Sequence, residues 1–505
     1  MKNVFLEKAG DIKIKLHEKI ASPKSVCSIV EHEKYYNGYG IKEVEPYSGR
    51  NVLQNGDICF NFGEHYVGYL SFKLSGMDEI CDSPVKLKFT FAEMPFEFSH
   101  KDGNEPGWLS YSWIQEEIIF VDVLPAEVTL PRRYAFRYVK IEILAKNKKM
   151  KLIFEDVKVK AVSAAGFGYK RVVKEDRFSK IDEVSQRTLR DCMQTVYEDG
   201  PKRDRRLWLG DIRLQALVNY CTIKDTELVK KCLYLFAGLC DEEGRVPACL
   251  YEKPGPMNGA IFLYDYSLLF MAALWDYYKF SGDKEFCEEL FDVAYQQFTR
   301  FYRIVTPEGV ALEQEGWWCF IDWDDELPKP LAMAAIGAYC LNFARDLAAE
   351  LGKNAQSKEA EKYRLLLCEG AKKYYFNSEK VAFEENGIVS WNVNSFWILA
   401  GAVSADEGRT IMKSLAENSE ARLPVTPYVY HYIMESYGVL GMKKEMEKLL
   451  FDYWGEMISC GADTFWEAFK KGDSQFSPYD DCVLNSACHA WSCTPVYLIK
   501  KYLEG

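Results

Sequence analysis

The sequence has little positive charge for its size and lacks long apolar segments. Its 63 lysines and arginines are outnumbered by 75 acidic residues, which leaves a net charge of −12, whereas phosphate binding requires a clustered basic surface. The first eight residues already hold three charges, and no run of 18 or more apolar residues follows, although secretory signals and membrane spans need such runs. We therefore expect a cytoplasmic protein whose partner is neither nucleic acid nor a membrane.

Several catalytic motifs are also missing. Histidine occurs only six times, and no two histidines have the i, i+4 spacing of a helical zinc site. The sequence contains no G-x-S-x-G elbow, no phosphate-binding P-loop and no G-x-G-x-x-G after a strand pattern. We expect no metal and no cofactor. Hydrolysis by paired carboxylates is the chemistry that remains.

The 16 cysteines are scattered along the chain without a C-x-x-C pair. Many of them, such as Cys232 and Cys240, fall inside apolar helical patterns. Buried, reduced thiols of a cytoplasmic protein explain this distribution better than a disulfide framework.

The first third of the chain alternates apolar and polar residues over short runs. The clearest runs are 57–62, 66–74, 85–91, 118–123, 138–143 and 152–159. A period of two, with Gly, Asn, Asp and Pro between the runs, is typical of an antiparallel sandwich. We therefore place an accessory β-sandwich, jelly-roll-like domain at residues 1–165.

From residue 166 to residue 505 the apolar period changes to 3.6, which predicts about eleven or twelve helices. Among the predicted segments are 394–417, 442–458 and 481–503. Paired helices without a sequence repeat favour a helical toroid, although a helical solenoid would give a similar pattern. Ten of the twelve tryptophans follow residue 200, many of them between helices. Such aromatic side chains could line a cavity and stack on sugar rings.

The segment DGPKRDRRLWLGD, residues 199–211, is the strongest candidate for a site. It holds three carboxylates, four cations and one tryptophan in thirteen residues. A solvated, charged connection between helices would have a similar composition. However, the Gly-Pro opening ends the preceding helix and the Trp-Leu-Gly-Asp close begins the next one, which favours an irregular loop with an aromatic wall.

Three further segments combine carboxylates with aromatic residues. They centre on Asp265, on Asp322 and on Glu467, which follows Trp466 directly. A carboxylate in apolar surroundings has a raised pKa, a common feature of acid or base catalysts. The alternatives are a core ion pair for Asp265, a helix N-cap for Asp322 and a first-turn helix residue for Glu467. His489, near the chain end, is either a core histidine or a ligand-binding residue.

These segments resemble those of a known family. Residues 199–211 are similar to the D-C-P-x-R-D-E-R-x-G-W-x-G-D signature of family 78 glycoside hydrolases, the α-L-rhamnosidases. Four other segments agree in the same order: 264–265, 322–323, the GADTFWE segment 461–467, and 486–491. The YAFRYV segment 134–139 looks like the end of the β-sandwich that precedes the catalytic domain in that family. The resemblance thus covers nearly the whole chain.

The resemblance implies an (α/α)6 six-hairpin barrel after the β-sandwich and an inverting, paired-carboxylate mechanism. In such a mechanism an acid protonates the glycosidic oxygen while a base activates water. Glu467 matches the general base of the family. Arg205 stands where the signature has its acidic Glu, so we assign the general acid to Asp204, as a subset of the family with an Asp there implies.

Substrate binding is assigned to residues around these two. Asp199 and Asp211 are expected to hold sugar hydroxyls, and four tryptophans are expected to face the methyl group of a 6-deoxy sugar. Neighbouring arginines would lower the pKa of Asp204, so they must point away or be offset by Asp199 and Asp211. The complete set of predicted binding residues is Asp199, Arg203, Trp208, Asp211, Asp265, Trp317, Asp322, Trp323, Trp466 and His489.

The sequence therefore predicts an inverting exo-α-L-rhamnosidase that acts on oligosaccharides or plant glycosides. Two alternatives stay open: an (α/α)6 glycosidase for another sugar, and a carbohydrate-binding relative without activity. A purely structural helical scaffold fits the Trp and carboxylate neighbours less well. A homodimer is among the assemblies that the sequence allows.

Overall fold

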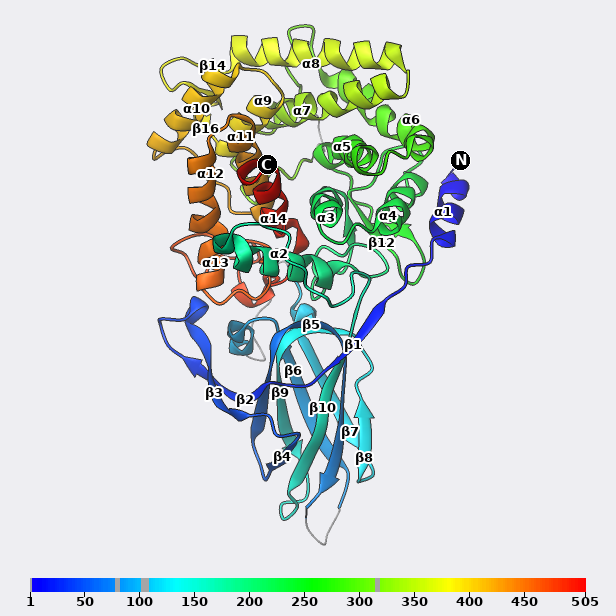
Figure 1. Ribbon diagram of the computed structural model, residues 1–505, viewed down its shortest axis with the longest axis vertical. Helices are drawn as coiled ribbons and strands as arrows, with labels where there is room; N and C mark the ends of the chain where they lie inside the picture. Colours follow the sequence, from blue (N-terminus) through cyan, green and yellow to red (C-terminus); the bar gives the residue numbers. More distant parts are fainter. Residues whose placement is uncertain (1, 78–81, 101–108, 314–317) are drawn as a thin grey trace.

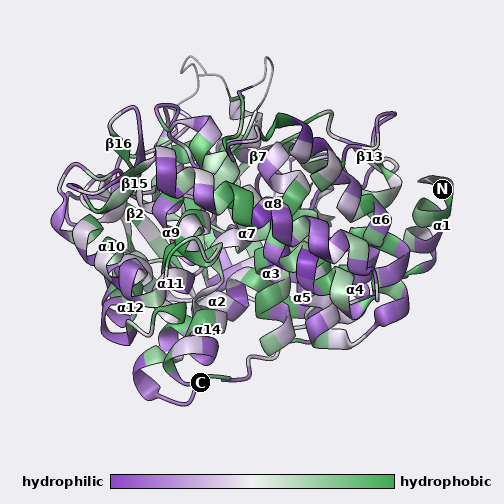
Figure 2. Ribbon diagram, turned by 90° about the horizontal axis from the view of Figure 1, so that it is seen from above, coloured by the Kyte–Doolittle hydropathy of each residue, from purple (hydrophilic) through white to green (hydrophobic). Residues whose placement is uncertain are grey.

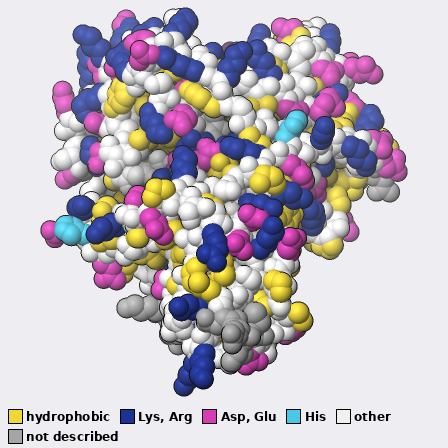
Figure 3. All heavy atoms as spheres, turned by 60° about the horizontal axis from the view of Figure 1, so that its bottom comes forward, with side chains coloured by type: hydrophobic (Ala, Val, Ile, Leu, Met, Phe, Trp, Pro, Cys, Tyr) yellow, Lys and Arg dark blue, Asp and Glu magenta, His cyan; other side chains and the backbone are white. Residues whose placement is uncertain are grey.

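The computed structural model describes residues 2–77, 82–100, 109–313 and 318–505. A β domain is followed by a larger helical domain, and the two pack against each other along one end of the helices (Figure 1). Cations and carboxylates are interspersed over the face that Figure 3 shows. Within the described ranges, no helix is long and apolar enough to cross a membrane.

The β domain is antiparallel, as its period-two pattern predicts. Its strands join in the order β1-β10-β5-β9-β6-β7, with β2, β4 and β8 paired at the side of this path and β3 paired with β2. The long strand β5 links both halves of the domain, because it pairs with β10 and also with β9 across register shifts. The strands are β1 (His17–Ala21), β2 (Ser25–Glu31), β3 (Tyr39–Pro46), β4 (Arg50–Leu53), β5 (Asp57–Gly76), β6 (Val85–Ala92), β7 (Gln115–Val121), β8 (Ala126–Thr129), β9 (Tyr134–Ala145) and β10 (Leu152–Ser163).

Alternate side chains of these strands fill an aromatic core. In β6 the inward positions Val85, Leu87 and Phe89 are buried, while the lysines between them are partly exposed. Phe91 stacks on Tyr134 with ring centroids 3.9 Å apart. Burial of this apolar surface stabilises the sandwich.

The chain begins with a helix that does not belong to the sandwich. Helix α1 (Lys2–Asp11) lies against helix α4 (Thr226–Gly238) of the helical domain. Phe5 and Ala9 join the core of that domain, and a Cβ at Gly238 would lie 2.8 Å from the Leu6 side chain. The first residues thus pack with the helices, and the sandwich proper runs from β1 to β10.

The helical domain is a closed ring of paired helices. Successive inner helices contact each other in the order α3, α5, α7, α9, α11, α14 and back to α3, and each contacts an outer partner. Inner helices such as α3 are buried on nearly all sides, whereas the outer helix α8, seen from above in Figure 2, carries many hydrophilic residues. The helices not yet given are α2 (Ser179–Cys192), α3 (Leu209–Cys221), α5 (Tyr264–Ser281), α6 (Lys284–Phe301), α7 (Lys329–Glu350), α8 (Asn354–Tyr374), α9 (Trp391–Leu399), α10 (Ala405–Glu417), α11 (Pro427–Val439), α12 (Lys443–Leu450), α13 (Glu456–Ser459) and α14 (Pro495–Leu498).

Two of the segments predicted as continuous helices are broken. The 394–417 segment divides into α9 and α10 around Gly401, which has φ +74°, and Ser404 then caps α10. The 442–458 segment is helical without interruption, as predicted, with a π-helical turn between α12 and α13. The 481–503 segment is mostly short turns before α14.

Candidate active site

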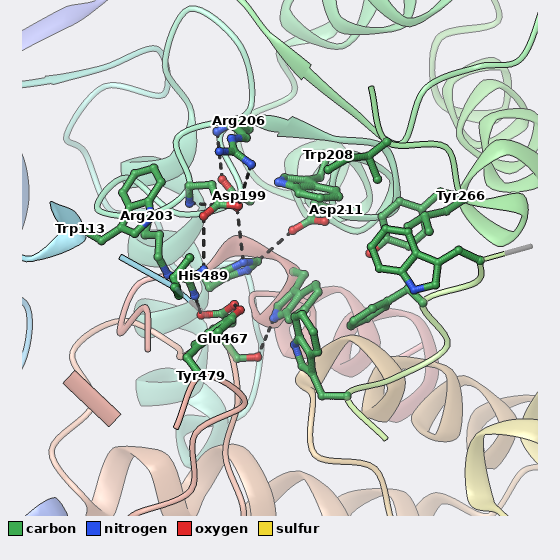
Figure 4. A pocket seen from close by; sticks show the side chains of 18 residues that line it. Trp113, Asp199, Arg203, Arg206, Trp208, Asp211, Tyr266, Glu467, Tyr479 and His489 are labelled. Atoms are coloured by element: carbon green, nitrogen blue, oxygen red, sulfur yellow. Dashed lines mark hydrogen bonds and ion pairs between the residues drawn. The ribbon is translucent and has the colours of Figure 1, made fainter. Parts of the chain in front are cut away.

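A cavity of about 210 Å³ opens where the β domain meets one end of the helical ring. Its walls combine four carboxylates with a majority of apolar and aromatic side chains (Figure 4). The lining residues are Leu109, Trp113, Asp199, Arg203, Asp204, Arg206, Trp208, Asp211, Ile261, Leu263, Tyr266, Trp318, Phe320, Trp323, Glu467, Tyr479, His489 and Trp491.

The 199–206 loop folds back on the Asp199 carboxylate. The backbone N–H of Asp204 donates to Oδ2 of Asp199, and that of Arg206 donates to Oδ1, both at 3.1 Å. A Cβ at Gly200 would lie 2.4 Å from the carbonyl oxygen of Arg203, so this tight fold requires glycine there. Asp199 thereby fixes the backbone that carries Asp204.

The three arginines of this loop have different roles. Arg205, with φ +61°, turns away from the cavity, and its guanidinium donates to the carbonyl oxygens of Pro201 and Arg133 at 2.7 and 3.1 Å. Arg203 and Arg206 instead lie 3.3 and 3.5 Å from the Asp204 carboxylate. Asp204 therefore lines the cavity and is ion-paired on two sides.

Asp199 and Asp211 both favour the protonated form. Burial, together with the nearby charge of Asp204, raises the pKa of Asp199 to about 8. Burial, with Asp199 and Glu467 close by, raises the pKa of Asp211 well above its usual value. The side of the cavity formed by Asp199 and Asp211 thus holds carboxyl protons at neutral pH.

Glu467 lies in the opposite electrostatic environment. It accepts hydrogen bonds from the Arg203 guanidinium and the Tyr479 hydroxyl, and from the backbone N–H of Ser486 at 3.1 Å. Burial alone would raise the pKa of Glu467, but the charge of Arg203 and the hydrogen bonds from Arg203 and Tyr479 together outweigh burial, and the pKa falls below its usual value. Glu467 is therefore ionised at neutral pH.

His489 lies between the two groups of carboxylates (Figure 4). Its Nε2 is 3.9 Å from Oδ2 of Asp199 and its Nδ1 is 3.7 Å from Oδ1 of Asp211. Burial lowers the pKa of His489 to about 4, so the ring is neutral at pH 7. Within the described residues, Nδ1 of His489 and Oδ1 of Asp211 have no hydrogen-bond partner. Such buried polar atoms are suited to ligand hydroxyls.

Aromatic side chains form most of the remaining wall. Phe320 lies between Trp323 and Trp491, with ring centroids 5.1 and 5.7 Å away, and Trp208 meets Tyr266 edge to face. The CH faces of a sugar would pack against this apolar surface.

Three predicted binding residues lie outside the cavity lining, because their side chains are used elsewhere. Asp265 accepts the backbone N–H groups of Phe320 and Ile321 at 3.2 and 3.3 Å. Asp322 accepts the Thr426 hydroxyl at 2.8 Å and a backbone N–H at 3.0 Å. Trp466 packs on Tyr36 of the β domain, with centroids 4.5 Å apart. Trp317 falls outside the described residues.

The cavity also contains residues that the sequence analysis did not select. Trp113 belongs to the β domain. It lies far in sequence from the other lining residues, so no sequence pattern connects it to the cavity. Tyr479, whose hydroxyl donates to Glu467, lies in a segment without a motif. Arg206 and Trp491 lie inside the family-like segments 199–211 and 486–491, so the sequence contained a signal for both as binding residues.

One group of side chains outside the cavity has the composition of a metal site. His65, Glu93 and Cys488 each offer a ligand atom within 4.8 Å of the others. His65 already bonds to Asp191 at 2.8 Å and to Glu93 at 3.2 Å. The Lys202 ammonium lies 3.7 Å from Glu93 and supplies a positive charge there. The group is thus built as a hydrogen-bonded, charge-paired cluster.

Comparisons with known proteins agree with this architecture. Residues 23–161 match the glycosyl hydrolase family 78 alpha-rhamnosidase N-terminal domain, and residues 173–503 match the bacterial alpha-L-rhamnosidase 6 hairpin glycosidase domain. The structure of a rhamnosidase from Klebsiella oxytoca with rhamnose bound is 36% identical, with a TM-score of 0.95 over 99% of this chain and 98% of that one.

More distant relatives are longer than this chain. The family 78 rhamnosidase of Bacillus sp. GL1 is 18% identical with a TM-score of 0.75, over 92% of this chain and 49% of that one. An alpha-L-rhamnosidase of Formosa agariphila is 22% identical over 294 residues, which are 56% of this chain and 30% of that protein. The chain thus spans less than a third of that curated relative. The two domain matches together extend over most of the chain, which belongs to glycoside hydrolase family 78 and has its six-hairpin glycosidase domain.

Proposed function

We propose that the protein is an inverting exo-α-L-rhamnosidase in which Asp204 is the general acid and Glu467 the general base. The observation that carries this proposal is the contrast between carboxyl environments within one cavity. Burial and the nearby charge of Asp204 keep Asp199 protonated at neutral pH, whereas Glu467 is ionised. Paired carboxyl groups whose pKa values are pushed apart are the arrangement that acid and base catalysis requires.

In this mechanism, Asp204, which lines the cavity, delivers a proton to the glycosidic oxygen. Asp199 is buried and bonded to two backbone N–H groups, so it supports the loop that carries Asp204, and its raised pKa keeps a proton in the site at neutral pH. Glu467 removes a proton from a water molecule, which attacks the anomeric carbon from the opposite face as the bond to the leaving group breaks. The product sugar then has the inverted anomeric configuration.

The substrate class follows from the remaining walls. His489 and Asp211 offer unpaired buried polar atoms to ring hydroxyls, and Phe320, Trp323 and Trp491 offer an apolar surface. A 6-deoxy sugar suits this combination, because its methyl group needs no hydrogen-bond partner. The rhamnosidase from Klebsiella oxytoca, the more similar solved relative, was determined with rhamnose bound.

Aryl glycosides of several sugars test the proposal. We expect hydrolysis of 4-nitrophenyl α-L-rhamnoside, and at least a 100-fold loss of kcat in Asp204→Asn and in Glu467→Gln, which is the usual scale of acid and base catalysis. Glu379→Gln, on an exposed hairpin, is the matched control and should behave as the wild type. Preference for another aryl glycoside would redirect the substrate assignment. Unchanged kcat in both cavity variants would exclude the mechanism.

A further inference from the structure

Lys202 is a buried cation that does not line the cavity. Only 2% of its side chain is exposed. Its ammonium lies 3.0 Å from Oε2 of Glu97 and 3.7 Å from Oε2 of Glu93, and it donates to the carbonyl oxygen of Asn485 at 2.8 Å. Burying a charged lysine is costly unless it is paired, so this position is specifically built to hold it.

Both carboxylates come from the β domain and are themselves fixed. Glu97 lies in the 3-10 turn Pro95–Ser99 after β6, and its Oε1 accepts the backbone N–H groups of Glu93 and Met94 at 3.1 and 3.0 Å. Glu93 accepts the backbone N–H of Ala487 at 2.7 Å. The β domain thus presents a rigid acidic anchor to the helical domain.

On its other side, Lys202 joins the two halves of the active site. It lies two residues before Asp204, in the loop closed by Asp199. The carbonyl oxygen that it binds belongs to Asn485, which precedes Ser486, and the N–H of Ser486 donates to Glu467. The neighbouring Arg203 binds the preceding carbonyl oxygen, that of Leu484, at 3.0 Å. Two consecutive cations therefore hold two consecutive carbonyl groups.

We propose that Lys202 is a positioning residue that fixes the separation of Asp204 and Glu467, with Glu97 of the β domain as its anchor. This inference rests on the proposed roles of those two carboxylates. Inversion requires a particular distance between acid and base, so that one water molecule fits between base and sugar. The β domain is then a part of the catalytic machinery, because it holds the clamp that sets this distance.

Replacement of Lys202 by methionine tests the clamp. We expect Lys202→Met to lower kcat by about 10- to 100-fold, since a displacement of about 1 Å can cost a factor of 100. KM should change less than about threefold, because Lys202 does not line the cavity. Lys202→Arg retains a donor and should recover part of the loss.

A double variant separates positioning from simple stability. Lys202→Met alone leaves Glu97 buried and unpaired and should lower the Tm. Lys202→Met/Glu97→Leu removes both charges and should restore much of the Tm. However, kcat should remain low, because the Asn485 carbonyl still lacks its donor. Recovery of kcat together with the Tm would overturn the proposal, as would a wild-type kcat in Lys202→Met.

Backbone hydrogen exchange provides a readout without turnover. Lys202→Met should speed exchange in residues 199–206 and 482–489 and leave helix α7 unchanged. Unchanged exchange in both segments would overturn the proposal, whichever sugar the wild-type protein hydrolyses. Failure of the proposed function would look different, since the wild type would then hydrolyse no α-L-rhamnoside, whatever the exchange data gave.

Discussion

At the residue scale, burial and local charge assign different protonation states to chemically similar carboxylates. Asp199 is raised to a pKa of about 8 by burial and by Asp204, whereas Arg203 keeps Glu467 ionised. Neutral His489 lies between them and adds no charge. The cavity therefore separates a proton donor from a proton acceptor before any substrate binds.

This separation predicts the pH profile of kcat/KM. The alkaline limb should fall near pH 8, where Asp199 loses its proton. Since the pKa of Glu467 lies below 4.5, the acidic limb should fall below about that pH. Asp199→Asn removes the buried carboxyl group that titrates near pH 8, so the alkaline limb should no longer fall at that pH. An unmoved limb in that variant would contradict its assignment to Asp199.

The sequence could identify these residues but not where they point. The motif located Asp204, Glu467 and the loop around them, because catalytic residue types recur at fixed spacing. The direction of Arg205 depends on the β domain, which contributes its acceptor at Arg133 from 72 residues away. The position of Trp113 in the cavity wall could not be predicted for the same reason, because only the folded chain brings it there.

At the element scale, buried carboxylates serve helix starts as well as chemistry. Asp322 bonds to Thr426, whose hydroxyl also caps α11, and to the backbone N–H of Val425. It was predicted as a sugar ligand because of its aromatic neighbours. The alternative considered for that position, a structural acidic residue, agrees better with these contacts, although the helix that it supports is α11 and not the one that follows it in sequence.

Asp322→Asn tests this assignment. The Asn side chain keeps one acceptor oxygen, but its NH2 group faces either the Thr426 hydroxyl or the Val425 N–H, which are both donors to Asp322. We therefore expect a loss of about 1–3 kcal/mol in the free energy of unfolding. KM for the aryl rhamnoside should stay within about a factor of two, because Asp322 does not line the cavity. Chemical denaturation and steady-state kinetics measure the two quantities. A large rise in KM at unchanged stability would return Asp322 to the binding site.

The broken helices show the same limit of sequence patterns. Apolar spacing predicted helix through 394–417, yet Gly401 and the Ser404 cap divide it. Spacing of 3.6 reveals which face is buried, but local turn geometry decides where a helix stops. Helix α1 was missed because its pattern is short and its partner, α4, is distant in sequence.

At the scale of the whole molecule, the two domains are joined by buried ion pairs. His65 of β5 lies between Asp191 of α2 and Glu93, which follows β6. Burial would lower the pKa of His65, but Cys488 and the hydrogen-bonded carboxylates of Asp191 and Glu93 raise it well above 6.5. The folded state therefore holds His65 charged at neutral pH.

This pairing predicts a pH-dependent contribution to stability. Because the pKa of His65 is raised in the folded state, its charge stabilises the fold fully below the unfolded pKa of 6.5. This stabilisation is progressively lost as the pH rises through the folded-state pKa. His65→Gln removes the cation between Asp191 and Glu93, which keep Arg190 and Lys202 as partners, and should cost about 1–3 kcal/mol at pH 6. The loss should be smaller at pH 9. His17→Gln, at an exposed position, is the matched control, and an equal loss at both pH values would contradict the charged state.

The domain architecture itself was accessible from sequence. Period-two and period-3.6 patterns distinguished the sandwich from the helical ring, and the resemblance identified the family. The contacts between domains were not accessible, because Lys202, Glu97 and His65 carry no motif and meet only after folding. Through these contacts, the β domain that was predicted to be accessory supports the cavity.

Proton NMR of the newly released sugar distinguishes inversion from retention. With 4-nitrophenyl α-L-rhamnoside as substrate, we expect β-L-rhamnose to appear first and the α anomer to form afterwards by mutarotation. Initial release of α-L-rhamnose would require a retaining mechanism and would contradict the roles given to Asp204 and Glu467.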